Sequence, residues 1–543
     1  MKKELATALA LLVAVCSFSP LRMAGAGRIS PVGQERKDNP AISPENARRC
    51  VADGRISYQD FGARGDGKTD DLPAIVATHA FANAHGLKVK AADNAVYYLG
   101  GRDLTADIRT DTDFGSAVFL IDDTQVENRN ANVFSVTSAL EHFTPALKSL
   151  RKGQPRLDVK LPDAAVLILK DSHVMRYIRR GVNRNNGSAQ TDVILVDKDG
   201  NVDPDTPVLW DFDRITEVTG IPVDPERLTL TGGKFRTIAN RAESKYTYYQ
   251  RGIKIERSNV LVEGLEHTIR GEGDHGAPYA GFLNITSCAN VTVRNTRLTG
   301  HKMYVTTGAS GDPSSMGSYD IGISSALNVT FVDCTQTNDI TDRKYWGILG
   351  SNYSKNLLYD GCVFSRFDAH MGVANATIRN STLGHQGINA IGSGVLRIEG
   401  CTILADNLVN LRADYGSTWQ GEFIIRDCVF VPRDPMRVAV IGGRNDGQHD
   451  FGYVCHMPRR ITLENLLIVD PRTRSYRGPA LFGNFNSAMK SREYVEPYPY
   501  VRTEEVILKN VSTRSGLPLR ISDNALMFKD VKITESSSPN PKS

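Results

Sequence analysis

The sequence predicts an all-β solenoid, a parallel β-helix in which short strands stack coil upon coil. A strand pattern recurs ten times, and each copy reads like NVTVRNT, in which apolar and polar residues alternate before a small polar turn residue. The copies start at residues 259, 290, 328, 356, 375, 395, 422, 460, 505 and 525. The shortest spacings, 19 and 20 residues from 356 to 375 to 395, fit one coil of three short strands. Longer spacings fit coils that carry insertions on one side.

Other repeat architectures fit these spacings less well. Leucine-rich repeats have a similar length, but their L-x-x-L-x-L-x-x-N pattern is absent. Propeller blades repeat regularly about every 40 residues, whereas the spacings here are shorter and uneven. The chain has 543 residues, 41% of them hydrophobic, which is enough to build a large core.

The repeat also places four cysteines at one position of the coil. The seventh residue of the pattern is Cys334, Cys362, Cys401 and Cys428 in four of the copies. We expect these side chains to stack in the interior as a ladder of small buried groups. Disulfides are the alternative, because an exported protein with eight cysteines often forms them. Neighbouring coils lie about 4.8 Å apart, but parallel Cβ vectors are poorly oriented for a bridge.

Ahead of the repeats, the segment SYQDFGARGDGKTDD (57–71) leads into a predicted helix. Its Gly67-Lys68-Thr69 run matches the end of a phosphate-binding loop, yet two aspartates follow where phosphate would lie. The acids give only a fragment of a calcium loop. Apolar residues with helical spacing predict a helix at 72–85, with Asp70 or Asp71 as N-cap and Gly86 as its stop. Two short strands follow in LKVKAADNAVYYLGG.

This opening resembles that of pectate-lyase-superfamily proteins. The resemblance rests on DFGARGDGKTDD (60–71), the helix after it, and the strand–turn–YYL that follows. It implies a single-stranded right-handed parallel β-helix (solenoid) whose N-terminal end is covered by a short capping helix. The resemblance is specific for the fold and says little about chemistry.

The predicted organisation begins with a signal peptide at 1–26, from Lys2-Lys3, an apolar run and AGA at 24–26. A linker (27–53), an N-terminal cap of the β-helix (54–100), the β-helix with loop insertions (101–534) and a disordered tail (535–543) follow. We expect a monomer that is secreted, periplasmic or on the cell surface of a Gram-negative bacterium. No other run is long and apolar enough to span a membrane. A net charge of +4 without a nucleic-acid motif does not indicate a nucleic-acid partner.

A second strand precedes the repeated line in five successive coils, and its side chains alternate in and out. We align YDIGIS, YWGIL, FDAHMG, QGINAIG and NLVNLRAD so that five residues point inward: Ile323, Ile348, Met371, Ala390 and Leu411. One outward row is then Gly322, Gly347, His370, Asn389 and Asn410. The row before it is Asp320, Tyr345, Asp368, Gly387 and Leu408, and Arg412 belongs to the row after. The flanking turns carry Arg366, His385, Asp414, Tyr415 and Lys344.

These rows predict a polar and aromatic patch that suits a polysaccharide chain. The alternative is a plain solvated face, but the row is rich in Asn, His, Arg, Tyr and Asp. Trp346 and Trp419 are either sugar-stacking groups or core residues. Two upstream stretches are further candidates: RYIRRGVNRNNG (176–187) for carboxylates or sulfates and SKYTYYQRG (244–252) for stacking on sugars. An edge strand and a tyrosine-rich turn are equally good interpretations of these two stretches.

The resemblance implies a carbohydrate-active protein: a polysaccharide lyase, a glycosidase or a spike adhesin. The pectin-hydrolase β-helices carry runs that TNDITD (337–342) and GHQG (384–387) only echo, and no adjacent aspartate pair follows residue 123. The central segments resemble more the β-helix lyases of gut bacteria that cut chondroitin sulfate and hyaluronan. We therefore expect a lyase that cleaves a uronic-acid-containing polysaccharide, either glycosaminoglycan or pectin-like, by β-elimination.

The roles follow from this chemistry. Asn389, Asn410 and Arg412 are expected to neutralise the uronate carboxylate, and His370 is expected to remove the C5 proton. Tyr345 is expected to protonate the leaving oxygen. The other predicted substrate contacts are Asp368, Arg366, His385, Tyr415 and Lys344. No cofactor is required, with calcium on Asp339 and Asp342 as the alternative. A glycosidase that uses Asp320, Asp368 and Asp414, and a non-catalytic glycan-binding spike, remain open.

Overall fold

The computed structural model describes residues 40–536 except 181–184, 244–246, 274–275, 308–312, 347–348 and 436. The predicted signal peptide (1–26), residues 27–39 of the predicted linker and residues 537–543 of the predicted tail lie outside the described residues. Residues 44–53, which the sequence assigned to the linker, form helix α1 (Pro44–Asp53). Ser43 caps this helix, because its side chain accepts a hydrogen bond from the N–H of Asn46.

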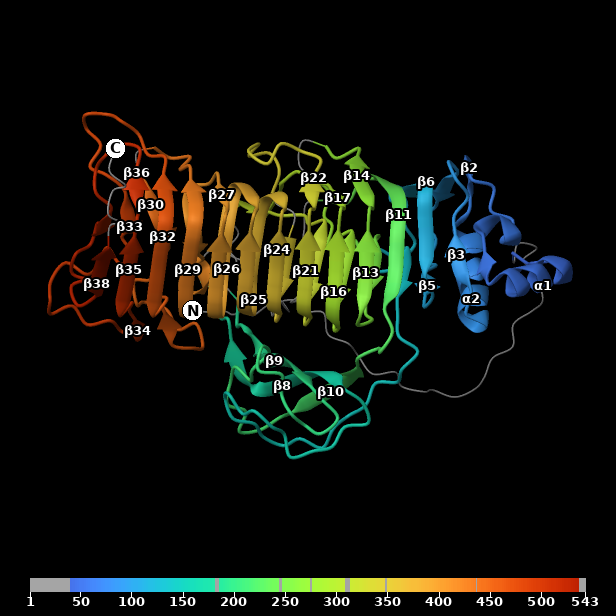
Figure 1. The fold of residues 1–543 in the computed structure, drawn as a ribbon, viewed down its shortest axis with the longest axis horizontal. Coiled ribbons are helices and arrows are strands. Elements are labelled where there is room, and N and C mark those ends of the chain that lie inside the picture. The colour runs from blue at the N-terminus through green and yellow to red at the C-terminus, as the bar shows by residue number, and fades with distance from the viewer. Residues whose placement is uncertain are drawn as a thin grey trace, which may run out of the picture. The chain divides into compact units, whose positions relative to one another are not determined.

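The chain forms a parallel β-helix, in which each strand pairs with the equivalent strand of the next coil (Figure 1). The repeated lines form its longest stack: β13 (Val260–Glu263), β16 (Ala289–Arg294), β21 (Leu327–Val332), β24 (Lys355–Asp360), β25 (Val363–Arg379), β26 (Thr382–Glu399), β29 (Trp419–Phe430), β32 (Arg460–Ile468), β35 (Glu505–Lys509) and β38 (Lys532–Ser536). The last repeat was placed wrongly at 525, since the strand that pairs with β35 begins at Lys532.

Two further stacks complete the coils. One consists of β14 (Glu266–Arg270), β17 (Arg297–Leu298), β22 (Thr335–Gln336), β27 (Thr402–Ile403), β36 (Ser512–Thr513) and the ends of the long strands. The other consists of β5 (Ala106–Ile108), β7 (Phe134–Val136), β12 (Ile253–Ile255), β15 (Leu283–Thr286), β20 (Ile321–Ser324), β23 (Leu349–Asn352), β28 (Asn407–Leu411), β30 (Ala439–Gly442), β33 (Ala480–Phe482) and β37 (Arg520–Ser522). Apolar side chains from all three stacks form one core.

The first coils include the predicted helix. Helix α2 covers Leu72–His85, and its buried residues belong to the same core as the strands. The elements around it are β1 (Arg55–Ile56), the 3₁₀ turn η1 (Tyr58–Phe61), β2 (Asp66–Asp70), β3 (Lys88–Lys90), β4 (Val96–Leu99), β6 (Thr112–Asp122) and β11 (Leu228–Ile238). The Asp71 carboxylate accepts the backbone N–H groups of Arg64 and Gly65, so this acid fixes the glycine-rich turn.

Two side-chain ladders hold the coils in register. Asn259, Asn290, Asn328 and Asn356 begin successive repeats in the left-handed backbone region, which asparagine tolerates. The side-chain amides of Asn290, Asn328 and Asn356 each donate to the Asn oxygen of the preceding coil, at 2.8–3.0 Å. In these coils, the Asn that begins the repeat therefore supplies both the turn conformation and a bond between coils.

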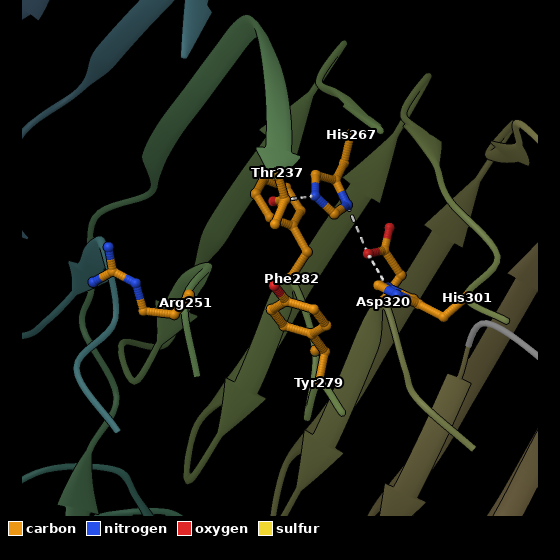
Figure 2. Close-up of a pocket in the computed structure, with 8 residues that line it drawn as sticks. Thr237, Arg251, His267, Tyr279, Phe282, His301 and Asp320 are labelled. Atoms are coloured by element: carbon orange, nitrogen blue, oxygen red, sulfur yellow. Dashed lines mark hydrogen bonds and ion pairs between the residues drawn. The ribbon is translucent and has the colours of Figure 1, made fainter. Parts of the chain in front are cut away.

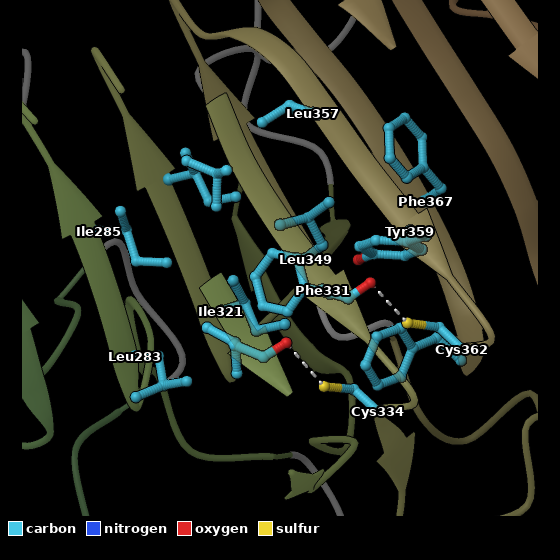
Figure 3. Close-up of a cluster of buried hydrophobic side chains, with 14 of the residues drawn as sticks. Leu283, Ile285, Ile321, Phe331, Cys334, Leu349, Leu357, Tyr359, Cys362 and Phe367 are labelled. Atoms are coloured by element: carbon cyan, nitrogen blue, oxygen red, sulfur yellow. Dashed lines mark hydrogen bonds between the residues drawn. The ribbon is translucent and has the colours of Figure 1, made fainter. Parts of the chain in front are cut away.

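The cysteine ladder lies in the interior, as predicted. Cys334, Cys362, Cys401 and Cys428 are buried free thiols, and Ser381 occupies the same position of the coil between them. The thiols donate to backbone carbonyls, as Cys334 does to Val293 and Cys362 does to Phe331 (Figure 3). All four cysteines are free and buried, so the interpretation as small buried groups holds.

A separate antiparallel sheet is inserted between β7 and β11. Strands β8 (Ala165–Arg176), β9 (Ser188–Val196) and β10 (Glu217–Pro222) surround a small core of their own. A buried ion pair joins this insertion to β24, with Lys355 Nζ 2.8 Å from Asp192 Oδ1 and both side chains 1% exposed. The insertion therefore places residues near 176–180 against the β-helix, far from them in sequence.

Two small two-stranded sheets and one 3₁₀ turn are separate from the three stacks. Strands β18 (Tyr304–Thr307) and β19 (Pro313–Met316) form an antiparallel hairpin, and β31 (Cys455–His456) pairs in parallel with β34 (Tyr500–Val501). The 3₁₀ turn η2 covers Ala413–Tyr415. Within the part of the chain that the structure describes, no helix is both long and apolar enough to cross a membrane.

Candidate functional site

The predicted outward face exists, but its rows are shifted in β25. Asp368 pairs with Asn389, and Asn389 pairs with Asn410, so these three residues form one row. The alignment had placed His370 in that row and Met371 inward. A β-bulge between Ala369 and Val373 shifts the pairing of β25 with β26 by two residues. Because side chains alternate with a period of two, His370 stays on the same face as Asp368, two residues further along the strand. Met371 instead packs in an outer cluster with Tyr177 and Tyr415.

The start of the row differs as well. Gly322 pairs with Gly350, so Gly350 takes the place that the alignment gave to Gly347. Gly347 and Ile348 lie outside the described residues. Leu349 pairs with Ile321 and is buried, which makes it the inward residue of this coil.

His370 is held as a neutral imidazole. Its Nδ1 lies 2.6 Å from the side-chain oxygen of Asn352, and its ring meets the Tyr415 ring edge-on with centroids 5.4 Å apart. Burial places the pKa of His370 well below its ordinary value, and the positive charges of Arg412 and Arg179 lower that pKa further. Since Nδ1 is engaged with Asn352, Nε2 is the nitrogen left to accept a proton.

Two arginines share one carboxylate beside this histidine. The Asp414 carboxylate lies 2.7 Å from Arg179 Nε and 2.7 Å from Arg412 Nη2, and all three side chains are partly exposed. Burial would raise the pKa of Asp414, but the two guanidinium groups outweigh it and lower that pKa. Both guanidinium groups also lie over the Tyr415 ring, 5.5 and 5.3 Å from its centroid. We call these residues the His370 site: His370, Arg179, Arg412, Asp414 and Tyr415.

A second group of the same kind lies next to it. Asp446 accepts from both Arg180 and Arg444, and Arg180 donates its backbone N–H to the Asp414 carbonyl. Each group contains two guanidinium charges and one carboxylate, so each keeps one positive charge. The stretch RYIRRGVNRNNG, singled out from the sequence, thus supplies Arg179 and Arg180 to the face of the β-helix. Arg184 of that stretch lies outside the described residues.

Several predicted site residues are buried and engaged with one another. Asn389 is 7% exposed, accepts from the Asn410 amide at 2.7 Å and donates to the Gln386 carbonyl. Arg366 and Asp368 form an ion pair that is covered by the chain near Trp346, whose ring lies 5.0 Å from the Arg366 guanidinium. The expectation that Asn389 and Asp368 face solvent is therefore wrong, because both are buried and bonded to neighbouring groups of the protein.

Other predicted residues lie apart from His370. The Tyr345 carbonyl accepts from His385 Nε2 at 2.7 Å near the start of β26, whereas His370 lies near the middle of β25. Lys344 is exposed in the same turn. Trp419 is fully buried and donates its indole N–H to the Gly394 carbonyl, so the interpretation as a core residue is right. The Tyr415 ring packs against His370, in the place expected for Tyr345.

The calcium alternative finds little support in this turn. Asp339 accepts from the backbone and hydroxyl of Thr341, and Asp342 accepts from the N–H of Lys344. These bonds are those of aspartates that shape a turn. Within the described ranges, no three His, Cys, Asp or Glu side chains form a group that could hold a metal ion.

Asp320 lies inside the β-helix and not on its outer face. Figure 2 shows its carboxylate between two imidazoles, with Oδ1 2.7 Å from His267 Nδ1 and 3.1 Å from His301 Nε2. His301 Nδ1 lies 3.3 Å from Glu272. Burial opposes a charge on His301, but its bonds to Asp320 and Glu272 outweigh burial and raise its pKa to about 9. We call these four residues the Asp320 cluster: Asp320, His267, His301 and Glu272.

The strand alternation misplaced Asp320 because it precedes β20 in a turn. Its Oδ2 accepts the backbone N–H of Thr299, and its partners come from two other coils. A neighbouring buried ion pair joins Arg251 to Asp123, which also accepts from the Tyr279 hydroxyl at 2.9 Å. The space between these groups is about 10 Å³, room for one water at most. The Asp320 cluster is therefore a polar part of the core.

Comparisons with known proteins agree with this fold. No protein-family model matches the chain. A depolymerase of Klebsiella phage P510, specific for capsule KL64, is 30% identical over 117 residues, which span 17% of this chain and only 11% of the relative. The tailspike gp61 of Pseudomonas phage phi297 is similar in structure, with a TM-score of 0.52 and 13% identity over 88% of this chain and 84% of its own.

A second solved structure is similar to the same extent. It is the gp54 tailspike of Acinetobacter baumannii bacteriophage AP22, in complex with A. baumannii capsular saccharide. Its TM-score is 0.51, with 10% identity over 92% of this chain and 82% of that chain. At such identities, the likeness establishes a parallel β-helix like that of the tailspikes, and the function must be argued from the residues.

Proposed function

We propose that this protein binds an acidic polysaccharide at the His370 site and cleaves it by β-elimination. The observation that carries the proposal is a neutral histidine beside two arginines that share one aspartate. The depolymerase and tailspike relatives act on or bind capsular glycans, by their names, which supports a glycan as the partner. Such a substrate places the protein outside the cell, either secreted or on a surface.

The chemistry of β-elimination needs three functions. The substrate carboxylate must be neutralised, because removal of the C5 proton creates an enolate dianion next to it. Arg179 and Arg412 together carry more positive charge than Asp414 cancels, and they are held rigidly by that carboxylate. Nε2 of His370 would take the C5 proton, since the imidazole is neutral and its other nitrogen is anchored. The C4–O bond then breaks as the C4–C5 double bond forms.

Tyr415 is the group that we assign to the leaving oxygen. Burial raises the pKa of Tyr415, so its hydroxyl keeps its proton at neutral pH. Its ring lies between His370 and the two arginines. The arginines supply the neutralising charge in this proposal, and no calcium is needed.

The carboxylates do not suit a glycosidase. Such an enzyme needs one acid with a raised pKa and a second carboxylate at a fixed separation. Asp320 is buried inside the coils, Asp368 is paired with Arg366 under a covering segment, and two arginines lower the pKa of Asp414. None of the three carboxylates proposed from the sequence is therefore placed as a general acid.

The experiment is a panel of uronate-containing and neutral polysaccharides, followed by ultraviolet absorbance of the unsaturated uronate and by new reducing ends. We expect both signals with at least one acidic polymer, and the same rate in EDTA. Arg412→Ala should lower kcat by roughly 10²–10³-fold, because a donor to the developing charge is lost. Reducing ends without absorbance would identify a hydrolase, and binding without either signal would identify a glycan-binding spike.

The pH dependence of the reaction tests the link between the arginines and His370. The pKa of His370 is lowered by burial and then by Arg412, so the wild type should stay active as the pH falls below the ordinary histidine value of 6.5. Removing the Arg412 charge should raise that pKa. In Arg412→Gln, the acid limb of kcat/KM should therefore move to higher pH. An unchanged limb would mean that another group acts as the base.

A further inference from the structure

A cleft adjoins segment 176–180, which also carries Arg179 of the His370 site. Its volume is about 350 Å³, within the range of about 300–1,000 Å³ that small-molecule sites occupy. Its lining comes from Arg176, from residues 498–499 and mainly from the stretch 449–455 before β31, near β34 in Figure 1. Segment 176–180 is tied to this stretch, since Ile178 donates its N–H to Phe451 and accepts from His449 Nε2. We call it the Tyr498 cleft.

The lining is largely aromatic and includes an exposed apolar side chain. Phe451, Tyr453 and Tyr498 line the cleft, and the Tyr498 side chain is 41% exposed. Val454 also lines the cleft and is 49% exposed. Exposed apolar groups gathered around a concave, partly polar site are typical of ligand binding. Tyrosine rings offer an apolar face to the C–H face of a sugar ring and keep a hydroxyl for hydrogen bonds.

The charges in the cleft disfavour an anionic ligand. Arg176 donates through Nε and Nη2 to Gln190 and through Nη1 to the Gly452 carbonyl, and its guanidinium lies 4.6 Å from the Trp210 ring centroid. The cation is thus engaged with the protein. Asp450 is exposed and accepts one N–H, from Gly452, so this carboxylate offers further acceptor capacity to hydroxyl groups. A carboxylate at the rim attracts hydroxyls and repels acidic sugars.

We propose that the Tyr498 cleft is a second glycan subsite, which takes an uncharged pyranose unit and stacks it on Tyr498. This inference rests on the proposed function, because it treats the cleft and the His370 site as two contacts with one polymer. Arg176 lines the cleft, and Arg179 belongs to the His370 site three residues later, roughly 10 Å along an extended chain. One glycan that contains acidic and neutral sugars would thus be recognised in two places, which fixes which unit reaches His370.

The test uses the full chain and two kinds of probe. Methyl glycosides of glucose, galactose, mannose and N-acetylglucosamine represent uncharged pyranoses, and methyl glucuronide represents the acidic unit. Binding is measured by ligand-observed NMR for wild type, Tyr498→Ala, Tyr498→Phe and Arg412→Ala. We expect at least one neutral glycoside to bind, with Kd about tenfold weaker in Tyr498→Ala and unchanged in Tyr498→Phe and Arg412→Ala. Binding of methyl glucuronide should be lost in Arg412→Ala and should be unchanged in both Tyr498 variants.

The outcomes separate this inference from the proposed function. The second-subsite inference is overturned if none of the neutral glycosides binds or if Tyr498→Ala leaves their binding unchanged. It is also overturned if Tyr498→Ala abolishes the binding of methyl glucuronide. The inference stands if binding of a neutral glycoside depends on Tyr498, even when no polysaccharide is cleaved. Cleavage tests only the His370 site. Because Tyr498 is exposed, its replacement should leave the thermal unfolding midpoint within the error of the wild-type value.

Discussion

His370→Ala is expected to lower kcat on the cleaved polysaccharide by roughly 10²–10⁴-fold, the usual contribution of a positioned general base. The imidazole is kept neutral by burial and by the arginines, and Asn352 fixes its orientation at 2.6 Å. Alanine removes the proton acceptor but leaves Arg179, Arg412 and Asp414 in place. KM should therefore change far less than kcat. Initial rates of unsaturated uronate formation give both constants.

His173→Ala is the matched control for that substitution. His173 is on the inserted sheet, its side chain is 57% exposed, and its Nδ1 lies 3.1 Å from the Asp171 carboxylate. Its replacement should leave kcat and KM at wild-type values. Asn352→Ala should produce part of the His370→Ala defect, because the ring would lose its anchor but keep its nitrogen. A folded His370→Ala protein with full activity would remove His370 from the reaction, and the base would have to be sought elsewhere.

The sequence predicted the coils well because their register is a local property. The repeat NVTVRNT includes the left-handed Asn that begins five of the ten lines and the small residue that follows the strand, and both lie within seven residues of each other. The placement of the cysteine ladder followed from the same periodicity. The last repeat failed because residues 525–531 show the same alternation as the strand, yet they form a turn before β38.

The candidate site was predicted only in part, for reasons of long-range packing. The alternation of strand residues put His370 and Arg412 on the correct face, but it gave no sign of the bulge after Ala369. Nothing local indicated that Arg179 would meet Asp414, since 235 residues separate them and the inserted sheet brings them together. The buried Arg366–Asp368 ion pair likewise has a neighbour from another coil, since the Trp346 ring lies 5.0 Å from the Arg366 guanidinium. The alternation of side chains along a strand gives no information about which other segments pack on that face of the β-helix.

Asp320→Asn is expected to be the most destabilising single substitution discussed in this chain. Asp320 is fully buried, and its two oxygens accept from His267, from His301 and from the N–H of Thr299. An asparagine amide has one oxygen, so its NH₂ group must face one of these donors. The charge that balances His301 is lost as well. Removing one partner of a buried ion pair costs roughly 3–5 kcal/mol.

The direction in which stability changes with pH follows from the shifted pKa values of His301 and Asp320. The pKa of His301 is raised to about 9, so its contribution is complete below the ordinary value of 6.5 and is lost as the pH rises through about 9. Against burial, His267 and His301 lower the pKa of Asp320, so its contribution is present above 3.8 and is lost in stronger acid. The stability gap between wild type and Asp320→Asn should therefore be widest between about pH 4 and 6.5 and should narrow toward pH 9.

Native-state hydrogen exchange of the amides in β14, β17 and β20 measures this loss in the coils that contain the cluster. Asp213→Asn is the control, because Asp213 pairs with Arg151 on the surface, where the two side chains are 84% and 66% exposed. Exposed pairs contribute about 0–1 kcal/mol. If Asp320→Asn lowers protection no more than Asp213→Asn does, the Asp320 cluster contributes nothing to stability. Its burial would then have to be explained by a function inside the coils, which the reaction proposed for the His370 site does not need.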